Sequence, residues 1–302
     1  MMLRRLLTVI ALLAAPTCFA DWSYQTVEGD GGVPLNVVTA GDPGSPPILF
    51  IHGLGQSHYS FVRQLNSDLA QDFFLVSFDL RGHGASGKPW LDEAYAEPRI
   101  WAQDVAAVLA ATRAERPIAV AWSYGTLVVL DYVREFGIDK LTGIVLTGAI
   151  GGLRPFRMPP ADPNAAEFAR IRELQLSPAI TDNIDAIQPM VRWLTATPLP
   201  AEEQQRFEAI SLMLPAYARR AMVKRRIDNQ DLLPKLKLQM LLSLGEKDNP
   251  IQLEDGAEMA ASYDNIKLSV YQGAGHSVFF QQPERFNAEL RQLAGRAWQG
   301  SN

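Results

Sequence analysis

The sequence AWSYG at residues 121–125 follows the apolar run PIAV and precedes the uncharged run TLVVL. We predict a strand, a sharp turn and a helix across this stretch, because the small residues Ala121 and Gly125 let the strand and the helix approach closely. The pattern departs from G-x-S-x-G at Ala121, whose methyl group adds little bulk. Such a turn holds its central side chain out from the end of a sheet, so Ser123 is a candidate nucleophile. An isolated match of this length would fit a surface serine equally well.

The groups that a serine nucleophile needs follow later in the chain. A serine hydroxyl requires an imidazole to take its proton and a carboxylate to orient that imidazole. The sequence GAGHS at 273–277 follows a strand-like run and presents His276. The sequence GEKDNP at 245–250 follows another strand-like run and carries Asp248. The three side chains would therefore lie just beyond the ends of strands, where open α/β sheets place their sites.

Two further segments complete a family pattern. The sequence HGLG at 52–55 follows the buried strand predicted at 47–51, and DLRGHGAS at 79–86 follows the strand predicted at 74–78. With the chain order serine, aspartate, histidine, the protein resembles α/β-hydrolase-fold proteins of the single-domain, cap-bearing kind, which include many carboxylesterases and the cofactor-free haloperoxidases. The resemblance implies an α/β fold with a mostly parallel sheet, flanking helices and an inserted helical cap. It also implies that the backbone N–H groups of Leu54 and Tyr124 form an oxyanion hole.

The alternation of strand-like and helix-like segments stops after the strand predicted at 141–147. We expect a core of residues 21–153 and 234–302, and a helical cap of residues 154–233 between them. Within the cap, apolar residues recur at helical spacing in four segments: 165–176, 184–193, 202–214 and 216–227. We expect the substrate-binding residues to include Trp122 beside the serine and apolar cap residues, although ordinary packing would also explain the latter. The cap candidates are Met190, Trp193, Leu212 and Met213.

The last predicted cap helix carries a basic cluster at residues 219–226. Its side chains could receive an anionic substrate or a lipid surface. A run of this kind is more often a solvated face, and we expect that here.

The four histidines do not have the spacing of a zinc site. His52 and His83 lie in glycine-rich turns, where a neutral ring is expected to connect loops, and His58 is expected near a helix start. Asp79 is expected, together with the charged residues Arg81 and Asp104, in a structural network of ion pairs or hydrogen bonds. We therefore expect neither a metal nor a cofactor.

Residues 1–20 resemble a cleavable signal peptide. Two arginines precede an apolar stretch that is short for a membrane span, and cleavage is expected after Ala20. A lipoprotein signal using Cys18 fits less well, because the preceding residues match poorly. We expect a periplasmic or secreted protein whose mature chain has no cysteine and so no disulfide. Its mildly acidic charge argues against a nucleic-acid partner.

The sequence thus predicts a serine hydrolase that cleaves a carboxylic ester of a small or medium apolar substrate through an acyl-enzyme on Ser123. The family resemblance implies that haloalkane dehalogenases and epoxide hydrolases use aspartate at this position, so the serine argues against both. Hydrolysis of lactones, amides, thioesters or carbon–carbon bonds, and perhydrolysis, remain open because they share the same side chains. A ligand-binding or receptor protein without turnover is the alternative outside enzymology.

Overall fold

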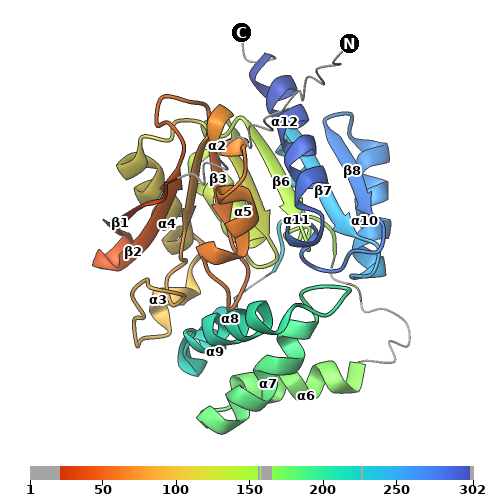
Figure 1. The fold of residues 1–302 in the computed structure, drawn as a ribbon. Coiled ribbons are helices and arrows are strands. Elements are labelled where there is room, and N and C mark those ends of the chain that lie inside the picture. Colours follow the sequence, from red (N-terminus) through yellow and green to blue (C-terminus); the bar gives the residue numbers. More distant parts are fainter. Residues whose placement is uncertain (1–20, 156, 158–164, 226, 300–302) are drawn as a thin grey trace, which may run out of the picture.

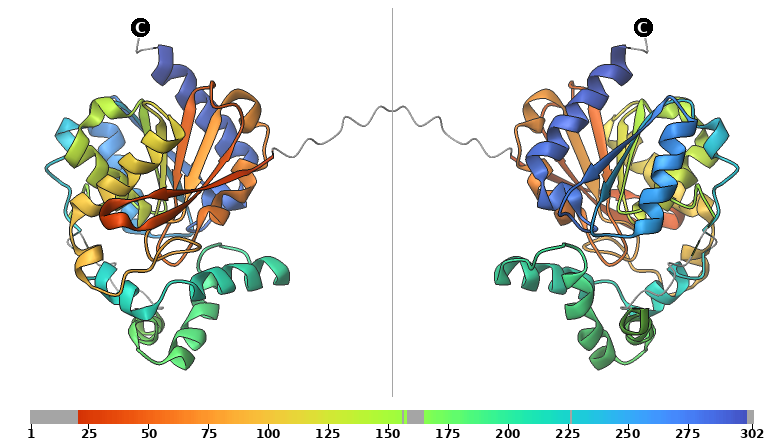
Figure 2. Two further views of the ribbon diagram at one scale, coloured as in Figure 1. Left: turned by 90° about the vertical axis from the view of Figure 1, so that its left-hand side faces the viewer. Right: turned by 90° about the vertical axis from the view of Figure 1, so that its right-hand side faces the viewer.

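The computed structural model of the 302-residue chain describes residues 21–155, 157, 165–225 and 227–299. Within this part, an eight-stranded sheet is flanked by helices on both faces, and a group of four helices lies beyond one end of the strands (Figures 1 and 2). The order of the strands across the sheet is β1-β2-β4-β3-β5-β6-β7-β8. The expected α/β architecture is confirmed, and the predicted signal segment 1–20 lies outside the described residues.

The strands are β1 Ser23–Glu28, β2 Pro34–Ala40, β3 Pro47–Ile51, β4 Phe74–Phe78, β5 Ile118–Trp122, β6 Gly143–Thr147, β7 Gln239–Gly245 and β8 Ile266–Tyr271. The core helices are α1 Val62–Leu65, α2 Leu69–Asp72, α3 Glu93–Ala96, α4 Pro98–Thr112, α5 Gly125–Phe136, α10 Pro250–Ser262, α11 Val278–Gln281 and α12 Pro283–Gln299. The helices between β6 and β7 are α6 Ala165–Leu176, α7 Ile180–Arg192, α8 Ala201–Leu212 and α9 Ala216–Met222. Short 3-10 helices lie at Asp30–Gly32, His58–Phe61, Ile138–Lys140 and Leu233–Lys235.

Strands β3 to β8 form a parallel sheet that is apolar on both faces. In β3, Ile48 and Phe50 face the hydrophobic cluster that includes α11 and α12, whereas Leu49 and Ile51 face the cluster that includes α4 and α5. All four side chains are fully buried. Burying side chains of this size contributes roughly 1.5–3 kcal/mol each. The sheet is therefore a rigid base for the loops at the carboxyl ends of its strands.

The strand β1 was not predicted from the sequence. It pairs antiparallel with β2 at the edge of the sheet, and five of its six residues are exposed. Its sequence SYQTVE consequently lacks the continuous apolar run that marks the central strands.

The four helices between β6 and β7 occupy the region predicted as the cap, and they form a separate layer below the core in Figure 2. Helix α6 has the predicted bounds, but α7 begins four residues earlier than predicted, at Ile180, and α9 ends at Met222 rather than 227. The first turn of α7 has the sequence ITDN, in which Ile180 is followed by three polar residues. Helix α9 is shorter because the chain turns back there, and the side chain of Arg225 bonds Asp131 on core helix α5.

No helix in the described part of the chain combines the length and the apolar character that a membrane span requires.

Candidate active site

Ser123 lies in the turn between β5 and α5, and its φ of 53° is in the left-handed region. Residues other than glycine adopt this strained conformation rarely, and it is often found at functional sites. The turn is held in place because the Ser123 N–H donates to the carbonyl of Thr147 at the end of β6, at 2.9 Å. The hydroxyl of Thr126 also donates to the Ser123 carbonyl, at 2.5 Å. The predicted strand, turn and helix are confirmed.

Gly125 is required by space at this turn. A Cβ atom on Gly125 would lie 2.4 Å from the carbonyl oxygen of Ile51 and 2.8 Å from that of His52. Any larger residue would therefore push α5 away from β3. Ala121, at the other small position, is fully buried.

Asp248 and His276 form a hydrogen-bonded pair between the loops that follow β7 and β8. Nδ1 of His276 lies 2.9 Å from Oδ2 of Asp248. A carboxylate only accepts hydrogen bonds, so Nδ1 carries the proton and Nε2 of the neutral ring is free to act as a base. Burial lowers the pKa of His276, but the charge and the hydrogen bond of Asp248 raise it, and the net shift is upward from 6.5.

Trp122 attaches the histidine loop to the strand that carries Ser123. Its indole N–H donates to the carbonyl of His276 at 2.9 Å, and its ring packs edge-on against Phe279. The side chain is 1% exposed. The packed indole therefore holds the loop of His276 in place. That Trp122 also contacts substrate stays a prediction.

Glu246, the acidic neighbour of Asp248, points elsewhere. Its Oε2 accepts the N–H of Gly273 at 3.0 Å and lies 3.5 Å from the ammonium group of Lys247. The Gly273 hydrogen bond is the main reason that the pKa of Glu246 is lowered. Of the two carboxylates beyond β7, Asp248 contacts the imidazole.

The loop after β3 lies directly against the serine. A Cβ atom on Gly53 would be 3.1 Å from the Cβ of Ser123, and Leu54 is the next residue. His52 holds this loop, since its Nε2 accepts the N–H of Leu80 at 2.9 Å and its Nδ1 donates to the Gly53 carbonyl at 2.8 Å. The neutral ring expected for His52 is confirmed, because burial lowers its pKa to about 4.

The two predicted oxyanion-hole donors are available. Among the residues that the structure describes, no protein acceptor takes the backbone N–H of Leu54 or of Tyr124. Both residues are only half-buried. That these two N–H groups form the oxyanion hole stays a prediction.

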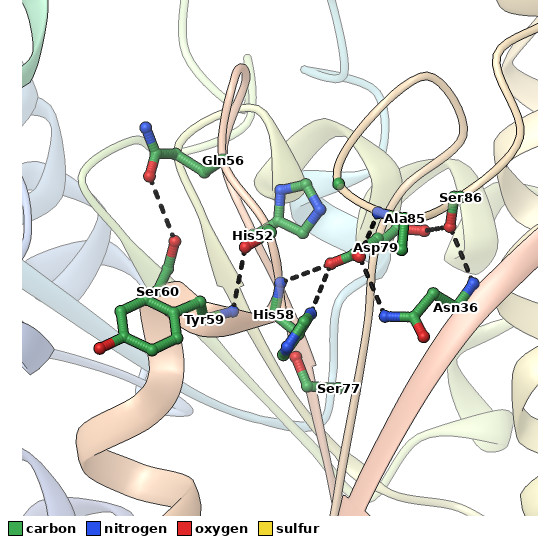
Figure 3. A network of polar contacts seen from close by, with 12 residues as sticks. Asn36, His52, Gln56, His58, Tyr59, Ser60, Ser77, Asp79, Ala85 and Ser86 are labelled. Carbon is green, nitrogen blue, oxygen red and sulfur yellow. Dashed lines mark hydrogen bonds and ion pairs between the residues drawn. The ribbon is translucent and has the colours of Figure 1, made fainter. Parts of the chain in front are cut away.

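Asp79 connects the loop after β3 with the loop after β4 (Figure 3). Its Oδ1 lies 2.8 Å from both the backbone nitrogen and Nδ1 of His58, and its Oδ2 accepts hydrogen bonds from Asn36 and Ala85. Burial alone would raise the pKa of Asp79, but the hydrogen bonds from His58 and the nearby rings hold it well below its usual range. The expected structural role is confirmed.

Arg81 and Asp104 form the second part of the expected network. The guanidinium of Arg81 donates two hydrogen bonds of 2.7 Å to the Asp104 carboxylate, and both residues are buried. Within the described ranges, no three His, Cys, Asp or Glu side chains are grouped so that they could hold a metal ion.

Helices α7 and α8 contact the loop after β3, which carries Leu54. The terminal methyl of Met190 would lie 3.5 Å from a Cβ atom on Gly55. The amide of Gln56 donates to the hydroxyl of Ser211 on α8 at 3.2 Å, and both residues are buried. The predicted lining residue Met190 is thus placed over this loop.

The other predicted lining residues lie on less buried parts of the cap. Trp193 stacks on Phe168 of α6, with ring centroids 5.1 Å apart and planes inclined by 10°. Leu212 and Met213 follow one another at the end of α8 and are 41% and 44% exposed. These side chains present apolar surface that a substrate could cover.

Two described residues of the basic cluster, Arg219 and Arg225, are buried rather than solvated. Arg219 is 2% exposed and donates to carbonyl groups inside the cap, including those of Gln175 and Leu214. Arg225 is also buried, and Lys224 is exposed but paired with Asp92. Our expectation of a solvated face is wrong, because helical spacing alone did not reveal that α9 packs on α6. Arg226 lies outside the described residues.

Two contributors to the site were missed from the sequence. Gln56 directly follows the sequence HGLG at 52–55, and this position was the sign in the sequence that Gln56 could belong to the site. Arg225 donates to the hydroxyl of Tyr124 at 2.9 Å. This role of Arg225 was not apparent from the sequence, because a run of positive charges suggested an exposed side chain.

Similarity to known proteins identifies the family of the chain. The model of the alpha/beta hydrolase family matches residues 48–289. A Burkholderia cenocepacia protein proposed to be an aryl esterase has a TM-score of 0.81 and 28% identity, and the match covers 92% of this chain and 100% of that one. The esterase RhEst1 from Rhodococcus sp. ECU1013 has a TM-score of 0.75 and 28% identity, with 89% and 98% covered. Epoxide hydrolase A from Mycobacterium tuberculosis is 36% identical over 98 residues, which are 32% of this chain and 30% of that protein. The chain belongs to the alpha/beta hydrolase family.

Proposed function

We propose that the protein is a serine hydrolase that cleaves a carboxylic ester of a small or medium apolar substrate. The observation that supports this most is the arrangement of Ser123 at a strained turn, with a His276–Asp248 pair at 2.9 Å on the neighbouring loops. The two esterases of 28% identity support an ester as the substrate class.

In the proposed mechanism, Nε2 of His276 takes the hydroxyl proton as Ser123 Oγ attacks the ester carbonyl. The carbonyl oxygen becomes an oxyanion that accepts hydrogen bonds from the N–H groups of Leu54 and Tyr124. His276 returns the proton to the alcohol as the carbon–oxygen bond breaks, leaving an acyl-enzyme. Water then attacks the acyl group while His276 again acts as base. The bond between the acyl group and Ser123 Oγ breaks, His276 returns the proton to Oγ, and the carboxylic acid leaves.

Epoxide hydrolysis is the other chemistry that the similar proteins raise. The family resemblance implies an aspartate nucleophile for that reaction, and this chain has Ser123 instead. The proposal is tested by labelling with a fluorophosphonate, followed by p-nitrophenyl esters of increasing acyl length. A chain that is not labelled and hydrolyses no ester would contradict it.

The pH dependence should follow His276. A protonated imidazole cannot accept the Ser123 proton, so kcat/KM should fall as the pH drops through the pKa of His276. Because the net shift of that pKa is upward, the midpoint of the acidic limb should lie above 6.5. Initial rates measured from pH 5 to pH 9 check this. In Asp248→Asn, burial acts without the opposing charge, so an NMR titration should place the His276 pKa lower than in the wild type. An unchanged pKa would show that Asp248 does not control the imidazole.

The apolar cap surface should select the acyl chain. Trp193→Ala or Met213→Lys should lower kcat/KM for long acyl chains relative to acetate by about tenfold, since losing a few apolar contacts costs roughly 1–3 kcal/mol. Ile180→Ala, at an exposed position of the same cap, is the matched control. The measurements are kcat/KM for acetyl to octanoyl esters and the melting temperature. An equal loss for all esters would assign these residues to packing alone.

A further inference from the structure

Arg225 connects the cap to the residue next to the proposed nucleophile. It follows α9 on the segment that returns from the cap to the core, and its side chain is 8% exposed. Nη1 donates to the hydroxyl of Tyr124 at 2.9 Å, and Nη2 donates to the carboxylate of Asp131 on α5. One guanidinium thus joins the cap segment, Tyr124 and the helix that begins behind Ser123.

The ring of Tyr124 is also held by aromatic contacts. Trp101 of α4 packs edge-on against it, with centroids 5.4 Å apart. The guanidinium carbon of Arg225 lies 5.0 Å from the Trp101 ring centroid and 5.5 Å from that of Tyr124, within the range of cation–π attraction. Trp101 comes from the core, whereas Arg225 comes from the cap.

Hydrogen bonds help to hold Arg225 at this place. A cavity of about 520 Å³ borders the residue, and Asp131, Arg134 and Asn229 are among the other lining residues. Arg225 itself is buried, and its bonds to Tyr124 and Asp131 fix the direction of the guanidinium.

The backbone of Tyr124 is the part that matters for chemistry. Its N–H is a proposed oxyanion donor, and it directly follows the strained residue Ser123. A small rotation of this peptide moves the N–H away from the oxyanion, and preorganised donors tolerate displacements of only about 0.5 Å. A ring that is anchored through its hydroxyl restricts that rotation.

We propose that Arg225 is a positioning residue, which orients the Tyr124 N–H through the Tyr124 hydroxyl and makes the oxyanion hole depend on the seating of the cap. A contact on the other side of the hole supports this: Gln56, two residues after Leu54, is bonded to Ser211 of α8. Both loops that supply the proposed donors are therefore bonded to the cap. The inference rests on the proposed hydrolase mechanism.

The test uses the full mature enzyme and the variant Tyr124→Phe, which removes only the hydroxyl and keeps the ring and the backbone N–H. We expect kcat to fall about tenfold with KM nearly unchanged, because loss of a whole oxyanion donor costs roughly 10²–10³ in kcat. A trifluoromethyl ketone that adds to Ser123 places an oxyanion in the hole, so its Ki should rise by the same factor. At pH 8 the Asp131 carboxyl stays ionised and the Tyr124 hydroxyl stays protonated, since burial raises the pKa of Asp131 to about 6 and that of Tyr124 to about 12.

A second variant tests the coupling. Arg225→Lys keeps a positive charge beside Asp131, but a single ammonium group lacks the two N–H donors that bond Tyr124 and Asp131 at once. This variant should lower kcat by a factor similar to that of Tyr124→Phe. In the double variant, kcat should be no lower than in Tyr124→Phe alone, because the same contact is already lost. The control is Tyr95→Phe, which removes the hydrogen bond from another buried tyrosine, to the carbonyl of Pro89. It should keep wild-type kcat.

Two results would overturn the inference: wild-type kcat and Ki in Tyr124→Phe, or an equal loss in Tyr95→Phe. Multiplicative losses in the double variant would also do so, since they would mean that the two residues act independently. Failure of the proposed function itself is recognised separately, because the wild-type enzyme would then not react with a fluorophosphonate.

Discussion

Replacing Ser123 by alanine is expected to abolish covalent labelling by fluorophosphonates and to lower ester turnover by roughly 10⁴- to 10⁶-fold. The hydroxyl is the only proposed nucleophile, so no acyl-enzyme can form without it. The fold should remain, because the bonds that hold the turn use the backbone N–H and carbonyl of Ser123 rather than its hydroxyl. Labelling followed by intact mass, together with the circular-dichroism spectrum, measures both effects.

The matched control is Ser262→Ala, at an exposed serine at the end of α10. It should keep full labelling and full turnover. Undiminished labelling of Ser123→Ala with a native spectrum would show that another serine does the chemistry. A receptor without catalysis would behave differently again: the wild type would bind ligand without turnover, and Ser123→Ala would leave that binding intact.

The central strands could be predicted from the sequence because they are buried on both faces. Residues 47–51 and 74–78 were predicted with the bounds that β3 and β4 have. The run in β3 is continuously apolar, and β4 has one polar residue, Ser77, which is also buried. The edge strand β1 is mostly exposed, so no local pattern distinguished it from a polar loop.

The candidate catalytic side chains could also be predicted from the sequence, because a tight turn after a strand needs small residues at fixed spacing. Ser123, Asp248 and His276 all lie in such loops. The roles of Trp122 and Arg225 could not be predicted, since they depend on contacts between segments far apart in the chain: the Trp122 indole bonds His276, and Arg225 bonds Asp131. The position beside Ser123 suggested a ligand contact for Trp122 and gave no sign of its bond to the histidine loop. A run of positive charges suggested a solvated side chain for Arg225, which is buried.

Asp248→Asn is expected to lower kcat on the order of 10⁴-fold, if the pair behaves as in serine proteases. The native carboxylate lies 2.9 Å from Nδ1 of His276 and accepts a hydrogen bond from its N–H. An asparagine amide can instead donate to Nδ1, which moves the ring proton to Nε2 and leaves no base for Ser123. KM should change much less than kcat, because Asp248 contacts the imidazole and not the substrate. Steady-state kinetics with a p-nitrophenyl ester measures both parameters.

Glu246→Gln separates this role from a general effect of negative charge near the site. Glu246 is exposed, and its carboxylate accepts the N–H of Gly273, a bond that a glutamine side-chain oxygen can also accept. We therefore expect its kcat to stay within a few-fold of the wild type. Collapse of Glu246→Gln with a nearly active Asp248→Asn would reverse the assignment of the acid, and would leave Ser123 and His276 as nucleophile and base. Equal, moderate losses in both would instead point to the summed negative charge beyond β7, which stabilises the imidazolium at longer range.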